Sequence, residues 1–322
     1  MWQTIGHEWA IELMQRSLAN ERSAQAVLLT GPDGVGKTHL AWRLAAALNC
    51  EGQERPCGQC RACRQVARAQ HPDVMLIEPD GARLKIDQVR ELQRTLALSP
   101  VLGRQRVAIL SQFEAATREA ANALLKTLEE PPPHATLVLT ASDADLLLPT
   151  IVSRCRLMAL RPVPVATLAE ALQRRQGVDA ERAHMVARLS GGRPGWALRA
   201  LDDPALLDSR AADLDLLQTL VQAGRWERLE AAERLARRDD LSDLLALWQV
   251  WWRDVQLTAL GCGDLVVNLD RTEAVAHAAE RVSAGQAGQA VGGLATARAR
   301  LLKNVNARLA LEAMLLQWQR AH

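Results

Sequence analysis

The fold is decided by the stretch Gly31-Pro32-Asp33-Gly34-Val35-Gly36-Lys37-Thr38, which matches the pattern G-x-x-x-x-G-K-[ST] in full. It follows the apolar run Val27-Leu28-Leu29-Thr30 and precedes a helical pattern over residues 38–49. This is the strand–loop–helix context that the motif requires. Glycines let the backbone N–H groups of such a loop surround phosphate oxygens, and the following helix start adds donors and a positive dipole end. We therefore expect a nucleotide site here.

The loop residues have distinct expected roles in binding ATP or ADP with Mg²⁺. Lys37 is expected to reach the β- and γ-phosphates, and the hydroxyl of Thr38 is expected to ligate Mg²⁺. A Gly-rich turn without a ligand is the alternative. The candidate nucleotide-binding residues are Gly31, Asp33, Gly34, Val35, Gly36, Lys37 and Thr38.

Three more short apolar runs extend the pattern: Val74–Ile77, Val107–Leu110 and Leu137–Thr140. Short, nearly continuous apolar runs are typical of strands buried on both faces of a parallel sheet. Helical patterns over residues 87–98 and 117–130 lie between them. This alternation predicts an α/β domain over residues 1–161.

The remainder of the chain has a different pattern. Arg161-Pro162-Val163-Pro164 predicts a linker, because proline removes backbone donors and disfavours helix before it. We expect a small helical domain over residues 162–204 and an all-helical domain over residues 205–322. Trp248, Trp251 and Trp252 fall at i, i+3 and i+4, which predicts one buried helix face rather than a ligand site.

Bulk composition excludes some classes of protein. The chain has 322 residues and a formal net charge of +2, so several domains are expected and the whole-molecule field does not favour nucleic acid. No apolar run is long enough to cross a membrane, and the N-terminus has no secretory pattern, so we expect a cytoplasmic protein without a membrane partner.

Four of the six cysteines are close together: Cys50, Cys57, Cys60 and Cys63. A reducing compartment argues against disulfides, and four thiolates close a tetrahedral structural Zn²⁺ site. We therefore predict a zinc module at about residues 50–63. An iron–sulfur cluster and free thiols are the alternatives.

The carboxylates that nucleotide hydrolysis needs are missing from their expected place. A phosphate-loop ATPase holds Mg²⁺ with an acidic residue at the end of a neighbouring strand. The strand Val107–Leu110 runs instead into Ser111 and Gln112. We therefore expect nucleotide binding with negligible hydrolysis. The alternative is a misplaced strand end, with Glu114 or Asp143 serving as the acid.

Two further motifs suggest a family. The stretch Ala121-Asn122-Ala123-Leu124-Leu125-Lys126-Thr127-Leu128-Glu129-Glu130-Pro131-Pro132 resembles the signature of AAA+ clamp-loader subunits of bacterial DNA polymerase III. Ser153-Arg154-Cys155 resembles the S-R-C motif of the same family. The resemblance covers residues 1–200 with specific motifs and the helical remainder only in general terms.

This resemblance implies an AAA+ domain with an inserted zinc module, a small helical lid and a helical C-terminal collar. It also implies that Arg154 acts in trans as an arginine finger on the nucleotide site of a neighbouring subunit, with no catalytic residue in cis. A surface arginine is the alternative. The implied partners are the gamma/tau and delta subunits, with the sliding clamp and primed DNA reached through the complex.

Departures from the family pattern favour the non-hydrolysing delta-prime branch over the gamma and tau motors. Ser111 and Gln112 replace the acidic pair, and Gly195 stands where the motors place a nucleotide-sensing arginine in the lid. Arg193 is a substitute only if the turn differs. An active gamma/tau-like ATPase is the alternative. A zinc-dependent nucleic-acid-binding protein is a third hypothesis, since several arginines lie near the cysteines.

Overall fold

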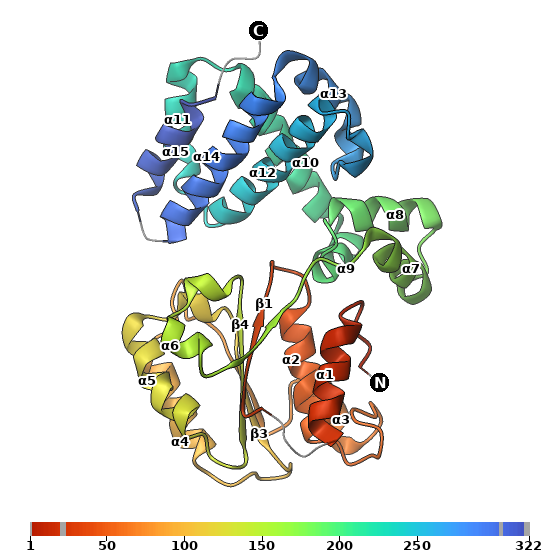
Figure 1. Cartoon of the computed structure of the whole chain (residues 1–322), viewed down its shortest axis with the longest axis vertical. Helices are drawn as coiled ribbons and strands as arrows, with labels where there is room; N and C mark the ends of the chain where they lie inside the picture. The colour runs from red at the N-terminus through yellow and green to blue at the C-terminus, as the bar shows by residue number, and fades with distance from the viewer. Residues whose placement is uncertain (1, 20–23, 303–304, 319–322) are drawn as a thin grey trace. The chain divides into compact units, whose positions relative to one another are not determined.

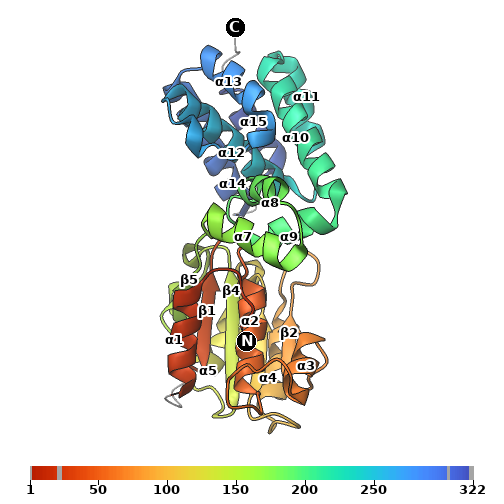
Figure 2. The same ribbon diagram turned by 90° about the vertical axis from the view of Figure 1, so that its right-hand side faces the viewer.

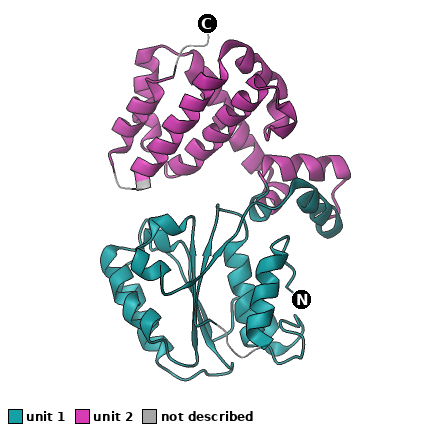
Figure 3. Ribbon diagram, in the orientation of Figure 1, with its two compact units in different colours: residues 1–175, 192–196 teal, residues 176–191, 197–322 magenta. Residues whose placement is uncertain are grey.

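The computed structural model describes residues 2–19, 24–302 and 305–318. The chain divides into two compact units, coloured separately in Figure 3. Unit 1 contains residues 1–175 and 192–196, and unit 2 contains residues 176–191 and 197–322.

Unit 1 is built on a five-stranded parallel sheet with the strand order β2-β3-β4-β1-β5. The strands are β1 (Ala26–Thr30), β2 (Val74–Ile77), β3 (Arg106–Leu110), β4 (Ala135–Ala141) and β5 (Arg156–Ala159). In register, Leu28 of β1 pairs with Leu139 of β4 on one side and Leu157 of β5 on the other. The carboxyl end of β1, which leads into the Gly-rich loop, therefore lies in the interior of the sheet.

Helices cover both faces of this sheet (Figure 1). One face carries α1 (Glu8–Ala19), α2 (Lys37–Leu48) and α3 (Arg61–Ala67), and the other carries α4 (Ile86–Leu96) and α5 (Arg118–Glu129). Alternation along β1 explains the two layers, because Val27 and Leu29 pack with α1 and α2 while Leu28 packs with α4 and α5. Burial on both faces is the reason for the continuous apolar strand sequences.

Shorter elements complete unit 1. They are the 3₁₀ turns η1 (Phe113–Ala115) and η2 (Ala144–Leu146), and the helices α6 (Pro149–Val152) and α7 (Val165–Gln176), the last residue of which belongs to unit 2.

The described part of unit 2 is helical throughout (Figure 2). Its helices are α8 (Ala180–Leu189), α9 (Pro194–Asp202, which begins in unit 1), α10 (Pro204–Gln222), α11 (Arg225–Leu235), α12 (Leu241–Ala259), α13 (Thr272–Arg281), α14 (Ala284–Leu302) and α15 (Ala307–Leu315), with the 3₁₀ turns η3 (Gly263–Leu265) and η4 (Leu269–Arg271).

Tryptophans form the centre of the unit 2 core. Trp248, Trp251 and Trp252 are at most 2% exposed, which confirms the buried face predicted for α12. Trp318 packs edge-on against both Trp248 and Trp252, with ring centroids 5.8 and 5.7 Å apart. Such pairs are a favoured aromatic geometry, and they join the end of the chain to α12.

The parallel sheet and all four predicted strands are confirmed, each within two residues at its start and one at its end. Helix α1 and strand β5 were not predicted. An all-helical domain was predicted for residues 205–322, and residues 205–302 and 305–318 contain no strand. Within the described ranges, no helix has the length and apolar character that a bilayer crossing requires.

Candidate functional site

The Gly-rich loop joins β1 to α2 at the carboxyl edge of the sheet. Gly31 has φ of +141°, and a Cβ there would come 2.3 Å from the carbonyl oxygen of Leu160, so only glycine fits. The buried imidazole of His7 donates from Nε2 to the carbonyl oxygen of Val35 at 2.9 Å. His7 therefore supports the loop from the N-terminal segment, a role that no sequence pattern indicated.

Lys37 is bound to its own loop. Its Nζ donates to the carbonyl oxygens of Gly31 at 2.5 Å and Pro32 at 3.3 Å, and to Asp33 Oδ1 at 3.1 Å. The side chain of Lys37 is 8% exposed, whereas that of Asp33 is 67% exposed. All three ammonium donors are thus occupied. A phosphate oxygen would have to compete with the Asp33 carboxylate for a hydrogen bond from Lys37.

The first turn of α9 packs against the same loop within unit 1. The Gly195 N–H donates to the carbonyl oxygen of Gly34 at 2.7 Å. A Cβ on Gly195 would lie 3.1 Å from that oxygen, a close approach that disfavours a side chain there. The Arg193 guanidinium lies 5.9 Å from the ring centroid of Trp196, in the range of a cation–π contact.

Strand β3 ends at Leu110, so the two residues directly after it are Ser111 and Gln112. Ser111 is buried and its N–H donates to Ile77 of β2. Gln112 has a left-handed backbone with φ of +50°, and its N–H donates to the hydroxyl of Thr140 at 3.1 Å. The register places a hydroxyl and an amide, both uncharged, at this edge of the sheet.

Glu114 is the first acidic residue after the end of β3. Its Oε1 accepts a hydrogen bond from the Ser142 N–H at 2.9 Å, just beyond β4. Its Oε2 is buried and has no hydrogen-bond partner among the described residues. Asp143, the other acid considered from the sequence, instead caps the turn η2 by accepting from the Asp145 N–H.

The four clustered cysteines converge after α2. Cys50 follows that helix, Cys60 is the N-cap of α3, and Cys63 lies in the first turn of α3. The four sulfur atoms all lie within 4.8 Å of one another, and Sγ of Cys50 is 4.0 Å from Sγ of Cys60. Zn–S bonds of ≈ 2.3 Å in a tetrahedron place sulfurs about 3.8 Å apart, so the cluster fits a metal ion of this kind.

Backbone N–H groups point at these sulfurs. Cys57 and Gly52 donate to Sγ of Cys50 at 3.3 and 3.4 Å, Cys60 donates to Cys57 at 3.3 Å, and Cys63 donates to Cys60 at 3.4 Å. Burial raises the pKa of Cys50 and raises that of Cys63 to about 12, whereas N–H donors from Cys60 and Gln59 lower the pKa of Cys57 to about 6. Such donors stabilise thiolates, which are the form that ligates metal.

Arg154 lies just beyond α6. Its Nη2 donates to Glu129 Oε1 at 2.5 Å, and its Nη1 donates to the carbonyl oxygen of Thr150 at 3.0 Å. The Arg154 side chain is 34% exposed. The guanidinium is therefore held at the surface of unit 1 with donors still available.

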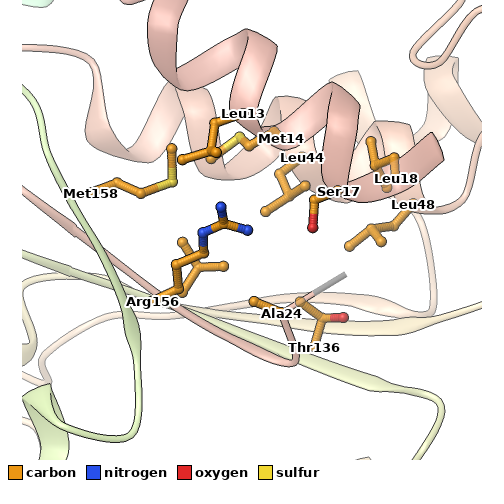
Figure 4. A pocket seen from close by; sticks show the side chains of 11 residues that line it. Leu13, Met14, Ser17, Leu18, Ala24, Leu44, Leu48, Thr136, Arg156 and Met158 are labelled. Carbon is orange, nitrogen blue, oxygen red and sulfur yellow. The ribbon is translucent and has the colours of Figure 1, made fainter. Parts of the chain in front are cut away.

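Unit 1 also has a narrow pocket beneath α1 (Figure 4). Its lining is mostly apolar, and the Arg156 guanidinium points toward Leu13 and Met14 of α1. Its volume of about 20 Å³ is room for about one water molecule. The Thr136 hydroxyl at its floor is buried without a partner among the described residues, which suits a bound water and no larger ligand.

Comparison with known proteins identifies the family. Residues 6–164 match a family described as "DNA polymerase III, delta subunit", and residues 206–320 match its C-terminal counterpart. The DNA polymerase III subunit delta' of Pseudomonas aeruginosa is 37% identical over 228 residues, which are 67% of each chain. The chain belongs to the delta-prime family of DNA polymerase III subunits. The delta' subunit of Bacillus subtilis is 28% identical over 320 residues, 96% of this chain and 95% of that relative.

DNA polymerase III subunits named gamma and tau are also similar to this chain. The DNA polymerase III subunit gamma of Buchnera aphidicola is 39% identical over 154 residues, 47% of this chain and 42% of that relative. Relatives named delta' and gamma therefore both match the chain.

Proposed function

We propose that the chain is a non-hydrolysing delta-prime subunit of a DNA polymerase III clamp loader, supporting ATP-driven loading of the sliding clamp onto primed DNA. The observation that carries this proposal is the pair Ser111 and Gln112 directly after β3. Neither a hydroxyl nor an amide can replace a Mg²⁺-binding carboxylate or a general base. Nucleotide held by the loop would therefore not be turned over at a useful rate.

The loop retains the groups that would hold nucleotide. Lys37 would engage phosphates once they displace its contacts with the loop carbonyls and Asp33, and Thr38 in the first turn of α2 would ligate the Mg²⁺ that accompanies them. Asp33 competes for Lys37, and Gly195 supplies no cationic side chain where it packs on the loop. These features support ATP or ADP as a bound ligand rather than a substrate.

Arg154 is proposed to act in trans as an arginine finger on a neighbouring gamma or tau subunit. Its exposed guanidinium, next to α6, suits a contact with another chain. A guanidinium neutralises charge on the transferring phosphoryl group, and such a finger is worth about 10³–10⁵ in rate. The catalytic acids and the finger would thus belong to different subunits.

The other parts have supporting roles in this proposal. Residues 1–161 would form the AAA+ domain, residues 162–204 the lid, and residues 205–322 the collar through which the gamma/tau and delta subunits are bound. The four cysteines would hold a structural Zn²⁺, whose binding free energy contributes directly to folding of the segment after α2.

One observation favours an active gamma/tau-like ATPase as a second candidate. Near the carboxyl end of β3, Glu114 has a buried carboxylate oxygen with no hydrogen-bond partner among the described residues, and the missing acid would have to be a carboxylate of this kind. Against this, its other oxygen is committed to the Ser142 N–H.

The test of the proposal is a reconstituted clamp loader containing the Arg154→Ala chain. Assembly is expected to be unchanged, while ATP turnover at the adjoining motor site falls by orders of magnitude. Arg156→Ala, which removes an exposed arginine of β5, is the matched control and is expected to leave turnover unchanged. Equal turnover in the Arg154→Ala and unmodified complexes would remove the finger from the account.

A further inference from the structure

The Arg154 guanidinium donates hydrogen bonds to acceptors on two helices of unit 1. The carboxylate of Glu129, at the end of α5, accepts from Nη2 at 2.5 Å, and the Thr150 carbonyl, in α6, accepts from Nη1 at 3.0 Å. Helices α5 and α6 pack side by side (Figure 1). Two acceptors from separate elements fix both the position and the plane of the guanidinium.

The position of Glu129 is unfavourable for the helix that carries it. Glu129 is the last residue of α5, and Glu130 is the C-cap. Carboxylates near a helix C-terminus face the negative end of the helix dipole and destabilise it. The ion pair with Arg154 offsets this repulsion for Glu129, whereas Glu130 makes no ion pair within the described ranges.

We propose that Glu129 is the positioning residue for Arg154, and that it pre-orients the guanidinium toward the nucleotide of a neighbouring subunit. This inference rests on the proposed role of Arg154 as a finger. A guanidinium has five N–H donors, and the contacts to Glu129, Thr150 and the Ser153 hydroxyl leave two for phosphate oxygens. An arginine already held in one rotamer loses less side-chain entropy when it binds.

The exposure of the Arg154–Glu129 ion pair indicates whether Glu129 positions the guanidinium or withholds it from other ligands. The side chains of Arg154 and Glu129 are 34% and 50% exposed. Ion pairs of this exposure are weak. A polyphosphate carrying several negative charges can therefore bind the remaining donors of Arg154 while Glu129 keeps its contact with Nη2. Glu129 therefore orients the finger without withholding it.

The experiment measures steady-state ATPase of the complete reconstituted complex with clamp and primed DNA. Glu129→Ala is expected to lower kcat about threefold, equivalent to about 0.7 kcal/mol at 1.4 kcal/mol per tenfold, with the KM for ATP unchanged. Glu129→Gln retains an acceptor oxygen for Nη2 and is expected to restore most of kcat. Glu130→Ala is the matched control and is expected to behave like the unmodified chain.

A double variant separates positioning from a general structural effect. In the Arg154→Ala background, adding Glu129→Ala is expected to change kcat no further, because the group that it positions is gone. Unchanged or increased kcat for Glu129→Ala alone, or an additive loss in the double variant, would overturn the inference. If Arg154→Ala itself leaves kcat unchanged, the finger proposal fails, and that outcome is distinct from a failure at Glu129.

Discussion

Replacing Asp73 by Asn should destabilise unit 1 strongly, although the two side chains have nearly the same shape. Asp73 is fully buried before β2, and both of its carboxylate oxygens are in use. Oδ1 accepts from the Val101 N–H at 2.7 Å, and Oδ2 accepts from the Leu102 and Gly103 N–H groups at 2.8 and 2.7 Å. The Asn amide has only one acceptor oxygen, so its NH₂ group must face at least one of these donors.

The magnitude follows from these contacts. Hydrogen bonds to a charged acceptor contribute about 1.5–3 kcal/mol each, and an amide that keeps two of the three in neutral form still leaves a backbone donor unpaired. The Arg106 guanidinium, 3.9 Å from Oδ1 and also buried, loses its counter-charge as well. We expect Asp73→Asn to lower the free energy of unfolding of unit 1 by about 3 kcal/mol.

The pKa of Asp73 predicts, independently, how the stability of unit 1 should depend on pH. Burial acts to raise the pKa, but the three N–H donors and Arg106 outweigh it and hold the pKa below its usual value. A folded-state pKa below the unfolded value means that the contribution to stability is present above the unfolded pKa and is lost as pH falls through the folded pKa. Unit 1 of the unmodified chain should therefore lose more stability on acidification than unit 1 of Asp73→Asn.

Asp254 in unit 2 provides the matched comparison. It is also fully buried, but all three of its hydrogen bonds, from Val267 and Asn268, fall on Oδ2, while Oδ1 has no hydrogen-bond partner among the described residues. Burial raises its pKa, so the ionised form costs stability as pH rises through the folded pKa. An Asn amide can keep all three bonds, and Asp254→Asn should be neutral or stabilising by up to about 1 kcal/mol.

Hydrogen exchange during urea unfolding measures the two units separately, which matters because a chain of two units need not unfold in one step. Peptides of unit 1 report on Asp73→Asn and peptides of unit 2 report on Asp254→Asn. A loss below about 0.5 kcal/mol for Asp73→Asn, or equal losses for the two variants, would refute the reasoning from acceptor geometry.

Three other changes have defined outcomes. Asp33→Asn removes the carboxylate that competes for Lys37 and should tighten ADP binding about threefold to tenfold by calorimetry, with Lys37→Ala as the non-binding control; weaker binding would contradict the competition. Chelation or Cys57→Ser should release about one zinc per chain and raise hydrogen exchange after α2, and a metal-free chain with full protection would exclude a structural metal. Arg228→Ala, which removes buried hydrogen bonds to the carbonyls that end α10 and α15, should destabilise unit 2 by about 3 kcal/mol or more in urea unfolding, whereas an unchanged midpoint would contradict this assignment.

Local patterns in the sequence predicted the local elements of the fold. Four apolar runs predicted four strands, and the Gly-rich motif predicted the loop and the start of α2, because these features depend on residues near one another. Strand β5 was missed because Arg156–Ala159 is mostly exposed at the sheet edge, so its sequence lacks the continuous apolar run of a central strand. The strand order also depends on partners far apart in the chain and left no local signal.

The same distinction applies to the candidate site. The cysteine spacing predicted a four-sulfur cluster, and the sulfur atoms do converge. Other contacts join segments 25 or more residues apart. They are those of Arg154 with Glu129, of Gly195 with Gly34, and of Asp73 with its three N–H donors. No periodicity or motif encodes such pairs.

The measurement that tests the central claim most directly is ATP turnover by the purified chain alone, compared with Lys37→Ala and Glu114→Gln variants. A non-hydrolysing subunit should show no turnover above that of the Lys37→Ala chain, and Glu114→Gln should change nothing. Turnover that Lys37→Ala and Glu114→Gln both abolish would contradict the account, because Glu114 would then supply the carboxylate that Ser111 and Gln112 lack.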